Sequence, residues 1–374
     1  MADNSLNRNT YLSKNIGDFP ETTIINGRNY IKVNDLRYGT NPHQPAAFYK
    51  PLDESSPVGD MQILKDGKSG LSQTNLEDIS YAMNIVKFFD TPACAVMKHV
   101  NPSGAAVQRD GEDLIDVYRK ARDADDRAAF GSAVAFNVEL DLATAAEIMG
   151  TFVECVVAPA YADGVVELFN DNERFKLNKH IRIIQCGDLD KLPKYVDENI
   201  DGKYNSMKVL ADGSIVIAAP LLTAIKGVDD LKIATAENRR AGAQTSTVKA
   251  SQAQLEDLLF GWYTNLSVRS NGVVIVKNGQ TLAVGTGEQD RVGAVEQAIA
   301  KFKEKYSGEE TLAGSTMSSD GFFPFPDAVE VAAAAGVTAI ISPAGSLRDA
   351  DVIKRANELG VALYHAPERI FSHH

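Results

Sequence analysis

The chain has 374 residues, of which 44% are hydrophobic and 24% are charged, a composition typical of a globular protein with two or three domains and a sizeable core. Its formal net charge is −12 and no segment is rich in Lys and Arg, so nucleic acid is not an expected partner. No uninterrupted apolar run approaches the roughly 20 residues of a membrane span, and the first residues carry no apolar stretch, so we expect a cytoplasmic protein without membrane contact.

Strand-like and helix-like segments alternate along the chain, which predicts an α/β fold. A helix is predicted over residues 75–89, because apolar residues recur there at helical spacing and Thr74 with Glu77 matches a capping box. Ser251 with Gln254 matches the same box before a second predicted helix. Short apolar runs bounded by turn residues predict strands at 92–97, 132–136, 155–158, 181–184, 214–218, 273–276, 281–284, 339–341 and 361–364.

Two connecting segments bear on the organisation of the chain. Asn278-Gly279 is the strongest hairpin signal, because both turn residues tolerate positive φ. The polar, turn-rich segment 187–212 lacks clear periodicity, and it fits either a boundary between two halves or a long surface excursion.

The first of these apolar runs, 92–97, ends next to Lys98-His99. The residues that follow, 101–104, are Asn-Pro-Ser-Gly, which is the composition of a turn. A strand that delivers an ammonium and an imidazole to a loop can serve acid/base catalysis. A Lys-His pair at a strand end is also commonly a solvated pair without chemical function, so this segment alone leaves both interpretations open.

Several familiar sites are excluded by pattern. The chain contains no phosphate-binding GxxxxGK[ST] loop, and the segment 285–290 lacks the third glycine of a dinucleotide loop. The zinc deaminase signature is missing, because His99 is not followed by the required Glu and no closely spaced cysteine pair exists. Cys94, Cys155 and Cys186 are widely separated and indicate neither a disulfide framework nor a zinc site.

Eight further segments accompany Lys98-His99 in a characteristic order. Together they resemble the transformylase portion of the AICAR formyltransferase/IMP cyclohydrolase family, from about Leu36 to the C-terminus. That bifunctional family formylates 5-aminoimidazole-4-carboxamide ribotide (AICAR) with 10-formyltetrahydrofolate as cosubstrate and then closes the ring to inosinate (IMP). The segments are LRYGTNPHQ (36–44), AFG (129–131), LDLATA (140–145), SNG (270–272), GTGEQDRV (285–292), SSDGFFPFPD (318–327), PAGSLRD (343–349) and ERIFSHH (368–374).

The resemblance implies two tandem cytidine-deaminase-like subdomains with mixed sheets flanked by helices. We place them at residues 34–200 and 201–374, after an N-terminal extension of residues 1–33. In the family a cyclohydrolase domain precedes the first of these segments, and residues 1–33 are too short for it. We therefore expect formylation without cyclisation, with a separate IMP cyclohydrolase as a candidate partner. Family members form homodimers whose active sites combine residues from both subunits, which implies a homodimer here.

The chemistry of the reaction suggests roles for three residues. The 5-amino group of AICAR is a weak nucleophile, and it must lose a proton as it attacks the formyl carbon. The resemblance places His99 as the acceptor of that proton, for which imidazole is suited near neutral pH. It places Lys98 beside the departing folate nitrogen or the oxyanion, and Asn271 as a hydrogen-bond donor to the oxyanion. Without the family context, Asn271 also fits an ordinary Ser-Asn-Gly turn.

Further site residues are implied by the same resemblance, although Gly131 also fits a simple turn and Phe322 a core position. Ser270 and Asp320 lie where some relatives bind a monovalent cation such as potassium, largely through backbone oxygens. Pro326 stands where the family usually has Arg, so the folate tail is expected to bind less tightly. The residues implied for AICAR are Arg37, Tyr38, His43, Asn75, Gly131, Asp141, Phe322, Arg369 and His373. Those implied for the folate are Arg291, Val292, Pro324, Phe325 and Asp327.

Two other functions are compatible with this pattern. The chain could be a non-catalytic sensor of purine ribotides or folates, but simple binding would not require Lys98, His99 and Asn271 together. It could also be an interaction subunit of a separate cyclohydrolase, which does not exclude transformylase activity.

Overall fold

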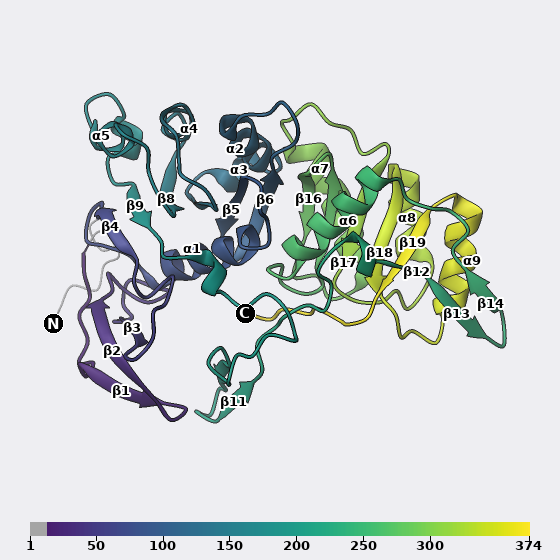
Figure 1. Cartoon of the computed structure of the whole chain (residues 1–374), viewed down its shortest axis with the longest axis horizontal. Helices are drawn as coiled ribbons and strands as arrows, with labels where there is room; N and C mark the ends of the chain where they lie inside the picture. Colours follow the sequence, from purple (N-terminus) through teal and green to yellow (C-terminus); the bar gives the residue numbers. More distant parts are fainter. Residues whose placement is uncertain (1–12) are drawn as a thin grey trace. The chain divides into compact units, whose positions relative to one another are not determined.

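Alternating strands and helices build an α/β fold, as the sequence predicts. The computed structural model describes residues 13–374, so residues 1–12 of the expected N-terminal extension lie outside the described part. Contacts divide the chain into two units (Figure 1): unit 1 comprises residues up to 122 together with 126–191, and unit 2 comprises 123–125 together with 192–374. Within residues 13–374, every helix is too short or too polar to cross a lipid bilayer.

Unit 1 holds a small antiparallel sheet and a larger mixed one. The small sheet contains β1 (Thr22–Ile25), β2 (Arg28–Asp35) and β3 (Ala47–Pro51). The larger sheet has the order β6-β5-β7-β8-β9-β4, formed by β4 (Gln62–Lys65), β5 (Ala93–Lys98), β6 (Asn101–Val107), β7 (Ser132–Phe136), β8 (Val153–Ala158) and β9 (Arg182–Gln185). The helices are α1 (Gln73–Val86), α2 (Leu114–Asp123), α3 (Asp126–Ala129), α4 (Leu142–Ile148) and α5 (Val165–Asn170), with 3₁₀ turns η2 (Lys176–Asn178) and η3 (Leu189–Lys191).

The two faces of the unit 1 sheet are covered by different helices. Along β5, Cys94 and Val96 belong to a buried cluster with α2, α4 and α5. Because side chains alternate along a strand, Ala93 and Ala95 face the other way, toward α1. Figure 1 shows α1 on the opposite side of these strands from α2, α4 and α5. The cysteines Cys94, Cys155 and Cys186 are buried as free thiols.

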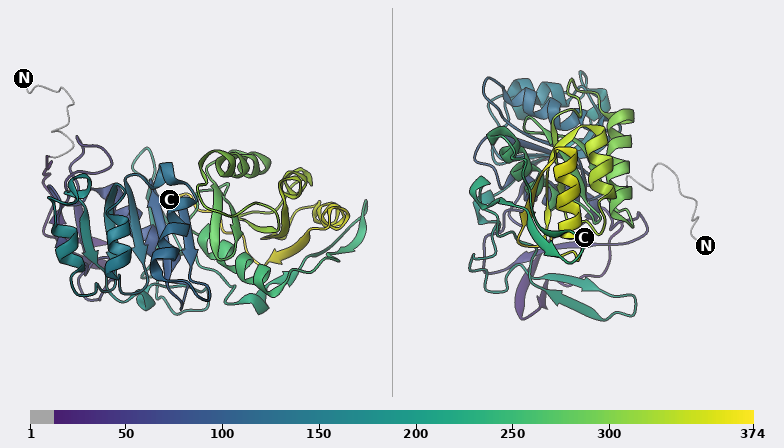
Figure 2. Two further views of the ribbon diagram at one scale, coloured as in Figure 1. Left: turned by 90° about the horizontal axis from the view of Figure 1, so that it is seen from above. Right: turned by 90° about the vertical axis from the view of Figure 1, so that its right-hand side faces the viewer.

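Unit 2 repeats this plan. Its strands are β10 (Ser206–Val209), β11 (Ile215–Ala218), β12 (Lys232–Ile233), β13 (Thr235–Asn238), β14 (Gly242–Thr245), β15 (Val273–Lys277), β16 (Gln280–Gly285), β17 (Ser315–Ser319), β18 (Val337–Pro343) and β19 (Ala362–Ala366). Its helices are α6 (Gln252–Asn265), α7 (Arg291–Lys305), α8 (Asp327–Ala335) and α9 (Asp349–Leu359), with the 3₁₀ turn η4 (Val228–Asp230). In the larger sheet, of order β12-β19-β18-β17-β15-β16, α6 covers one face and α7, α8 and α9 cover the other (Figure 2).

The connectivity of the two larger sheets is the same. In unit 1, α1 precedes the antiparallel pair β5 and β6, β5 pairs antiparallel with β7, and β8 and β9 follow in parallel. In unit 2, α6 precedes β15 and β16, β15 pairs antiparallel with β17, and β18 and β19 follow in parallel. Each unit therefore contains a hairpin, preceded by a helix, at corresponding positions.

Local corrections follow from hydrogen bonds that the sequence pattern did not reveal. The N-cap of α1 is Ser72, whose hydroxyl accepts the backbone N–H of Asn75, so the capping box predicted at Thr74 and Glu77 is wrong. The box at Ser251 and Gln254 is confirmed. The predicted turn at 101–104 is also wrong, because these residues begin β6.

Candidate functional site

The turn that carries His99 lies between β5 and β6. Lys98 at the end of β5 pairs with Asn101 at the start of β6, which leaves His99 and Val100 as a two-residue turn. Both have positive φ, 53° for His99 and 60° for Val100, as a hairpin turn of this length requires. A β-branched residue is strained in this conformation. His99 is exposed at the tip of the turn, and Lys98 is half-buried beside it.

Lys98 and Gly131 are brought together by the structure. The Nζ atom of Lys98 donates a hydrogen bond to the carbonyl oxygen of Phe130, at 2.5 Å. Gly131 follows with a φ of 78°, and its N–H donates to the carbonyl of Phe152 at 2.8 Å. A Cβ atom at Gly131 would lie 3.8 Å from Nζ of Lys98 and 3.4 Å from the Phe152 ring. The glycine therefore leaves room beside the ammonium group.

A second cluster in unit 1 surrounds Arg37, which is only 6% exposed. Its Nη2 donates to Oδ1 of Asn75 at 3.3 Å, and its guanidinium lies 4.6 Å from the ring centroid of Tyr38. Asn75 stands in the first turn of α1 and donates from Nδ2 to a carboxylate oxygen of Glu154, at 2.9 Å. Arg37, Tyr38 and Asn75, all implied by the resemblance, are thus brought together.

Sequence reasoning missed Arg182 in this cluster. Burial lowers the pKa of Arg37, and the positive charge of Arg182 lowers it further. Arg182 is 4% exposed and lies 3.9 Å from Glu154, while its Nε donates to the carbonyl of Gly70. A signal was available, because Arg182 is a charged residue inside the apolar strand predicted at 181–184. Two buried guanidinium groups near one carboxylate favour the binding of an anion.

His43 and Asp141 are placed differently. His43 is exposed in the turn that ends at Gln44, whose N–H donates to the carbonyl of Asn41. Asp141 is the N-cap of α4, and its carboxylate accepts the N–H of Thr144 at 2.7 Å. The N-cap role accounts for Asp141 structurally. Neither His43 nor Asp141 takes part in the contacts described for the Arg37 cluster.

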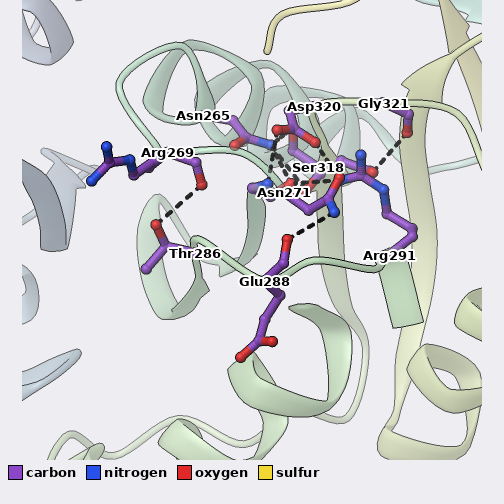
Figure 3. A network of polar contacts seen from close by, with 11 residues as sticks. Asn265, Arg269, Asn271, Thr286, Glu288, Arg291, Ser318, Asp320 and Gly321 are labelled. Carbon is purple, nitrogen blue, oxygen red and sulfur yellow. Dashed lines mark hydrogen bonds and ion pairs between the residues drawn. The ribbon is translucent and has the colours of Figure 1, made fainter. Parts of the chain in front are cut away.

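In unit 2, Asn271 lies in the loop between α6 and β15 (Figure 3). Its backbone N–H and its Nδ2 both donate to the carbonyl oxygen of Glu288, at 3.2 and 2.9 Å. The next residue, Gly272, donates its N–H to Oδ2 of Asp320 at 2.8 Å. These bonds hold the loop on both sides of the Asn271 side chain.

Arg291 and Asp320 form a buried ion pair in the same network. Nη1 of Arg291 contacts Oδ1 of Asp320, and it also lies 3.4 Å from the carbonyl oxygen of Gly272 (Figure 3). The other carboxylate oxygen of Asp320 accepts the Gly272 N–H, so both oxygens are engaged. Arg291, which the resemblance implies for the folate, is therefore also a structural anchor of the Asn271 loop.

The C-terminal segment packs against this loop through Phe371. The guanidinium groups of Arg369 and Arg291 lie 4.4 and 5.6 Å from the Phe371 ring centroid, and the His373 ring meets it edge-on. The backbone N–H of Ser270 donates to the carbonyl of Ser372 at 2.9 Å. The structure thus brings Arg369, His373, Arg291 and Ser270 together.

The segment before α8 exposes two aromatic rings. Phe322 is 37% exposed and Phe325 is 50% exposed, whereas Phe323 between them is buried, so Phe322 is not a core residue. The guanidinium of Arg348 lies 5.0 Å from the Phe325 ring centroid. Three further residues implied for the folate lie at the ends of helices or just before one: Pro324 is exposed, Asp327 begins α8, and Val292 is half-buried in α7.

Comparisons with known proteins identify the family of the chain. Residues 4–301 match the family model described as the AICARFT/IMPCHase bienzyme, a match that begins before Leu36. The bifunctional purine biosynthesis protein PurH of Acetivibrio thermocellus is 38% identical over 368 residues, covering 97% of this chain and 63% of the relative. PurH of Oceanobacillus iheyensis is 35% identical, covering 98% of this chain and 64% of the relative.

A third relative, PurH of Nostoc punctiforme, is 37% identical and covers 91% of this chain and 59% of that protein. A solved structure of dCMP deaminase from the cyanophage S-TIM5, in complex with dCMP and dUMP, is 25% identical, covering 25% of this chain and 77% of that one. Its TM-score is only 0.19, so it contributes nothing to the assignment. The chain spans about three fifths of the length of the curated relatives it matches. By the family match and these identities, the chain belongs to the AICARFT/IMPCHase bienzyme family.

Proposed function

We propose that this chain is an AICAR formyltransferase, which transfers the formyl group of 10-formyltetrahydrofolate to the 5-amino group of AICAR, and that it lacks IMP cyclohydrolase activity. The observation that carries the proposal is the Lys98-His99 turn. It presents an exposed imidazole on a strained backbone, directly beside an ammonium group for which Gly131 leaves room. Strained backbone of this kind is concentrated at functional sites.

The reaction assigns a separate task to each group. The amine of AICAR attacks the formyl carbon, and His99 takes the proton that the amine loses. Lys98 supports the negative oxygen or the departing folate nitrogen. Asn271 donates to the oxyanion, for which one N–H of its Nδ2 remains beyond the bond to Glu288. The resulting bond joins the amine nitrogen to the formyl carbon. The bond between the formyl carbon and the folate nitrogen breaks, and tetrahydrofolate leaves with a proton on that nitrogen, which balances the proton that His99 took from the amine.

Binding of the ribotide is proposed for the Arg37 cluster. Arg37 is held by Asn75 and Tyr38, and Arg182 adds a second buried cation. Guanidinium groups recognise phosphate oxygens with directed hydrogen bonds, so this cluster suits the phosphate of AICAR. His43, Gly131, Asp141, Phe322, Arg369 and His373 complete the proposed AICAR set.

The exposed rings of Phe322 and Phe325 favour binding of a flat aromatic cosubstrate. We propose that Phe325, with Pro324, Val292, Arg291 and Asp327, contacts the folate. We propose that a monovalent cation such as potassium near Ser270 and Asp320 would be held largely by backbone oxygens, since each carboxylate oxygen of Asp320 already has a partner. We also propose a homodimer, and two tandem deaminase-like subdomains, which the shared connectivity of the two larger sheets supports.

The test is to mix the purified chain with AICAR and 10-formyltetrahydrofolate, follow tetrahydrofolate release, and identify the nucleotide product. We expect formyl-AICAR to accumulate without IMP. Formation of IMP would contradict the proposed lack of cyclohydrolase activity. Binding of both ligands without any product would contradict the transferase and favour a sensor.

A further inference from the structure

The hairpins at corresponding positions of the two units share one local design. In unit 1, β5 ends at Lys98, the turn is His99-Val100, and β6 begins at Asn101. In unit 2, β15 ends at Lys277, the turn is Asn278-Gly279, and β16 begins at Gln280. All four turn residues have positive φ. The two turns therefore have the same length and the same class of backbone conformation.

Each turn is held by an aspartate of the preceding helix. Asp257 of α6 accepts the N–H groups of Asn278 and Gly279, both at 2.8 Å. Asp78 of α1 accepts the N–H of Val100 at 2.7 Å, and the backbone of His99 helps to lower the pKa of the same carboxyl group. The two aspartates are buried, at 6% and 5% exposed, and each is the sixth residue of its helix.

The two turns differ in how easily their residues adopt this backbone. Asn-Gly is the sequence that a two-residue turn with positive φ prefers. His-Val is a poor choice, because a β-branched residue at positive φ is strained. Unit 2 demonstrates that this fold can form the turn without such strain. The strained His-Val turn of unit 1 therefore indicates a functional role for these residues, and its backbone must be stabilised by another group.

We propose that Asp78 is a positioning residue for His99. It holds the strained turn by its backbone N–H groups, and so determines where the imidazole is presented. This inference rests on the proposed role of His99 as the proton acceptor. Asp257 accepts backbone N–H groups in the same way at the Asn278-Gly279 turn, which carries no residue of the proposed site. It therefore provides a matched control within the chain.

The test compares Asp78→Ala with Asp257→Ala in the full chain, measuring steady-state formyl transfer and amide hydrogen exchange. For Asp78→Ala we expect kcat to fall by about 100-fold, the effect typical of a displaced catalytic group, with little change in KM for AICAR. For Asp257→Ala we expect an unchanged kcat and faster exchange at Asn278 and Gly279. Equal losses of kcat in both variants would overturn the proposal, because they would indicate a general structural effect.

A rescue experiment tests whether Asp78 acts by stabilising the strained His99-Val100 turn or in some other way. In the double variant Asp78→Ala/Val100→Gly, glycine adopts positive φ without strain, so most of the lost kcat should return. Failure of this rescue would contradict the proposal. If Asp78→Ala does not fold, Asp78→Asn retains one acceptor oxygen, and we expect a smaller loss of kcat that Val100→Gly again reverses.

Amide hydrogen exchange tests the role of Asp78 independently of whether the chain has formyl transfer activity. If the wild-type chain forms no product at all, the proposed function fails. Exchange at the His99 and Val100 amides still decides whether Asp78 holds the turn: faster exchange in Asp78→Ala supports that part, and unchanged exchange overturns it.

Discussion

Arg291 and Asp320 form an ion pair in which both side chains are withdrawn from solvent, with 6% and 0% exposed. The pair joins the start of α7 to the segment after β17, and through Gly272 it fixes the loop that carries Asn271. Arg291, which the sequence associated with the folate, thus also holds the loop of Asn271, a proposed catalytic residue.

Removing one partner of this buried ion pair should lower the stability of the protein. Asp320→Ala leaves the Arg291 guanidinium buried without its carboxylate, and we expect the free energy of unfolding to fall by about 3–5 kcal/mol. Urea unfolding measures this. The control is Glu330→Ala, which removes an exposed ion pair with Arg355 and should cost about 1 kcal/mol or less. Equal costs for the two variants would contradict a structural role of the buried pair.

Asn75 should matter both for stability and for the ribotide. Asn75→Ala removes the capping box of α1 together with the contacts to Arg37 and Glu154. We expect a loss of about 2–4 kcal/mol, because a cap is lost and buried polar groups lose their partners. We also expect weaker AICAR binding, measured by calorimetry.

The matched control for Asn75 is Gln254→Ala, which removes the same capping partner from α6 at a half-buried position, together with a hydrogen bond to Thr338. This variant should cost about 1 kcal/mol and leave AICAR binding unchanged. AICAR binding by Asn75→Ala at the wild-type affinity would argue against the Arg37 cluster as the ribotide site.

Gly131→Ala tests the space beside Lys98. The φ of 78° at Gly131 is unfavourable for alanine, and the new methyl group would contact the Phe152 ring. We expect a stability loss of about 1–2 kcal/mol together with reduced formyl transfer. Gly111→Ala has a similar φ of 82° but opens into free space, so it should show the backbone cost with normal activity. Normal activity in both variants would show that the room beside Lys98 is not used.

The Lys98 and His99 roles are tested by truncation. Lys98→Ala or His99→Ala should abolish turnover, since each removes a group that acts in the reaction. AICAR binding should remain within about tenfold, or roughly 1.4 kcal/mol. Stopped-assay kinetics and calorimetry on the same preparations separate the two effects. Full activity in either variant would refute its assigned role.

Asp78 should also make stability depend on pH. Burial raises the pKa of Asp78 from 3.8 to about 6 and outweighs the hydrogen bond from Val100, while Glu154 raises it further and His99 lowers it. Between these values the folded state keeps a proton that the unfolded state releases. The contribution of Asp78 to the free energy of unfolding therefore decreases as pH rises from about 4 to about 6, by up to roughly 3 kcal/mol.

The measurement is the difference in free energy of unfolding between the wild type and Asp78→Asn, followed across this pH range. The wild type should lose stability relative to the variant as pH rises. Glu147 offers a control of opposite sign, because its hydrogen bond with Arg119 lowers its pKa to about 2. Its contribution should be complete above about 4.5 and lost as pH falls toward 2. A difference for Asp78 that does not vary with pH would refute the assignment.

The sequence by itself determined the elements whose patterns are local. Apolar residues at helical spacing predict α1, the Ser251 and Gln254 box marks the start of α6, and Asn278-Gly279 predicts the hairpin of unit 2. The strand predicted at 132–136 is β7. The ordered motifs also determined the family, because they depend on residue identity rather than on packing.

Only the tertiary structure decided where polar or turn-like sequences become strands. β17 reads Ser-Thr-Met-Ser-Ser, yet all of it is buried between β15 and β18, where Thr316 and Ser318 find partners in Val276 and Asn265. Likewise, pairing with β5 makes a strand of Asn101–Val107 and moves the turn to His99 and Val100. In that turn, Val100 donates its backbone N–H to Asp78, a residue 22 positions away in the sequence, and a strained backbone persists only where the surrounding structure holds it.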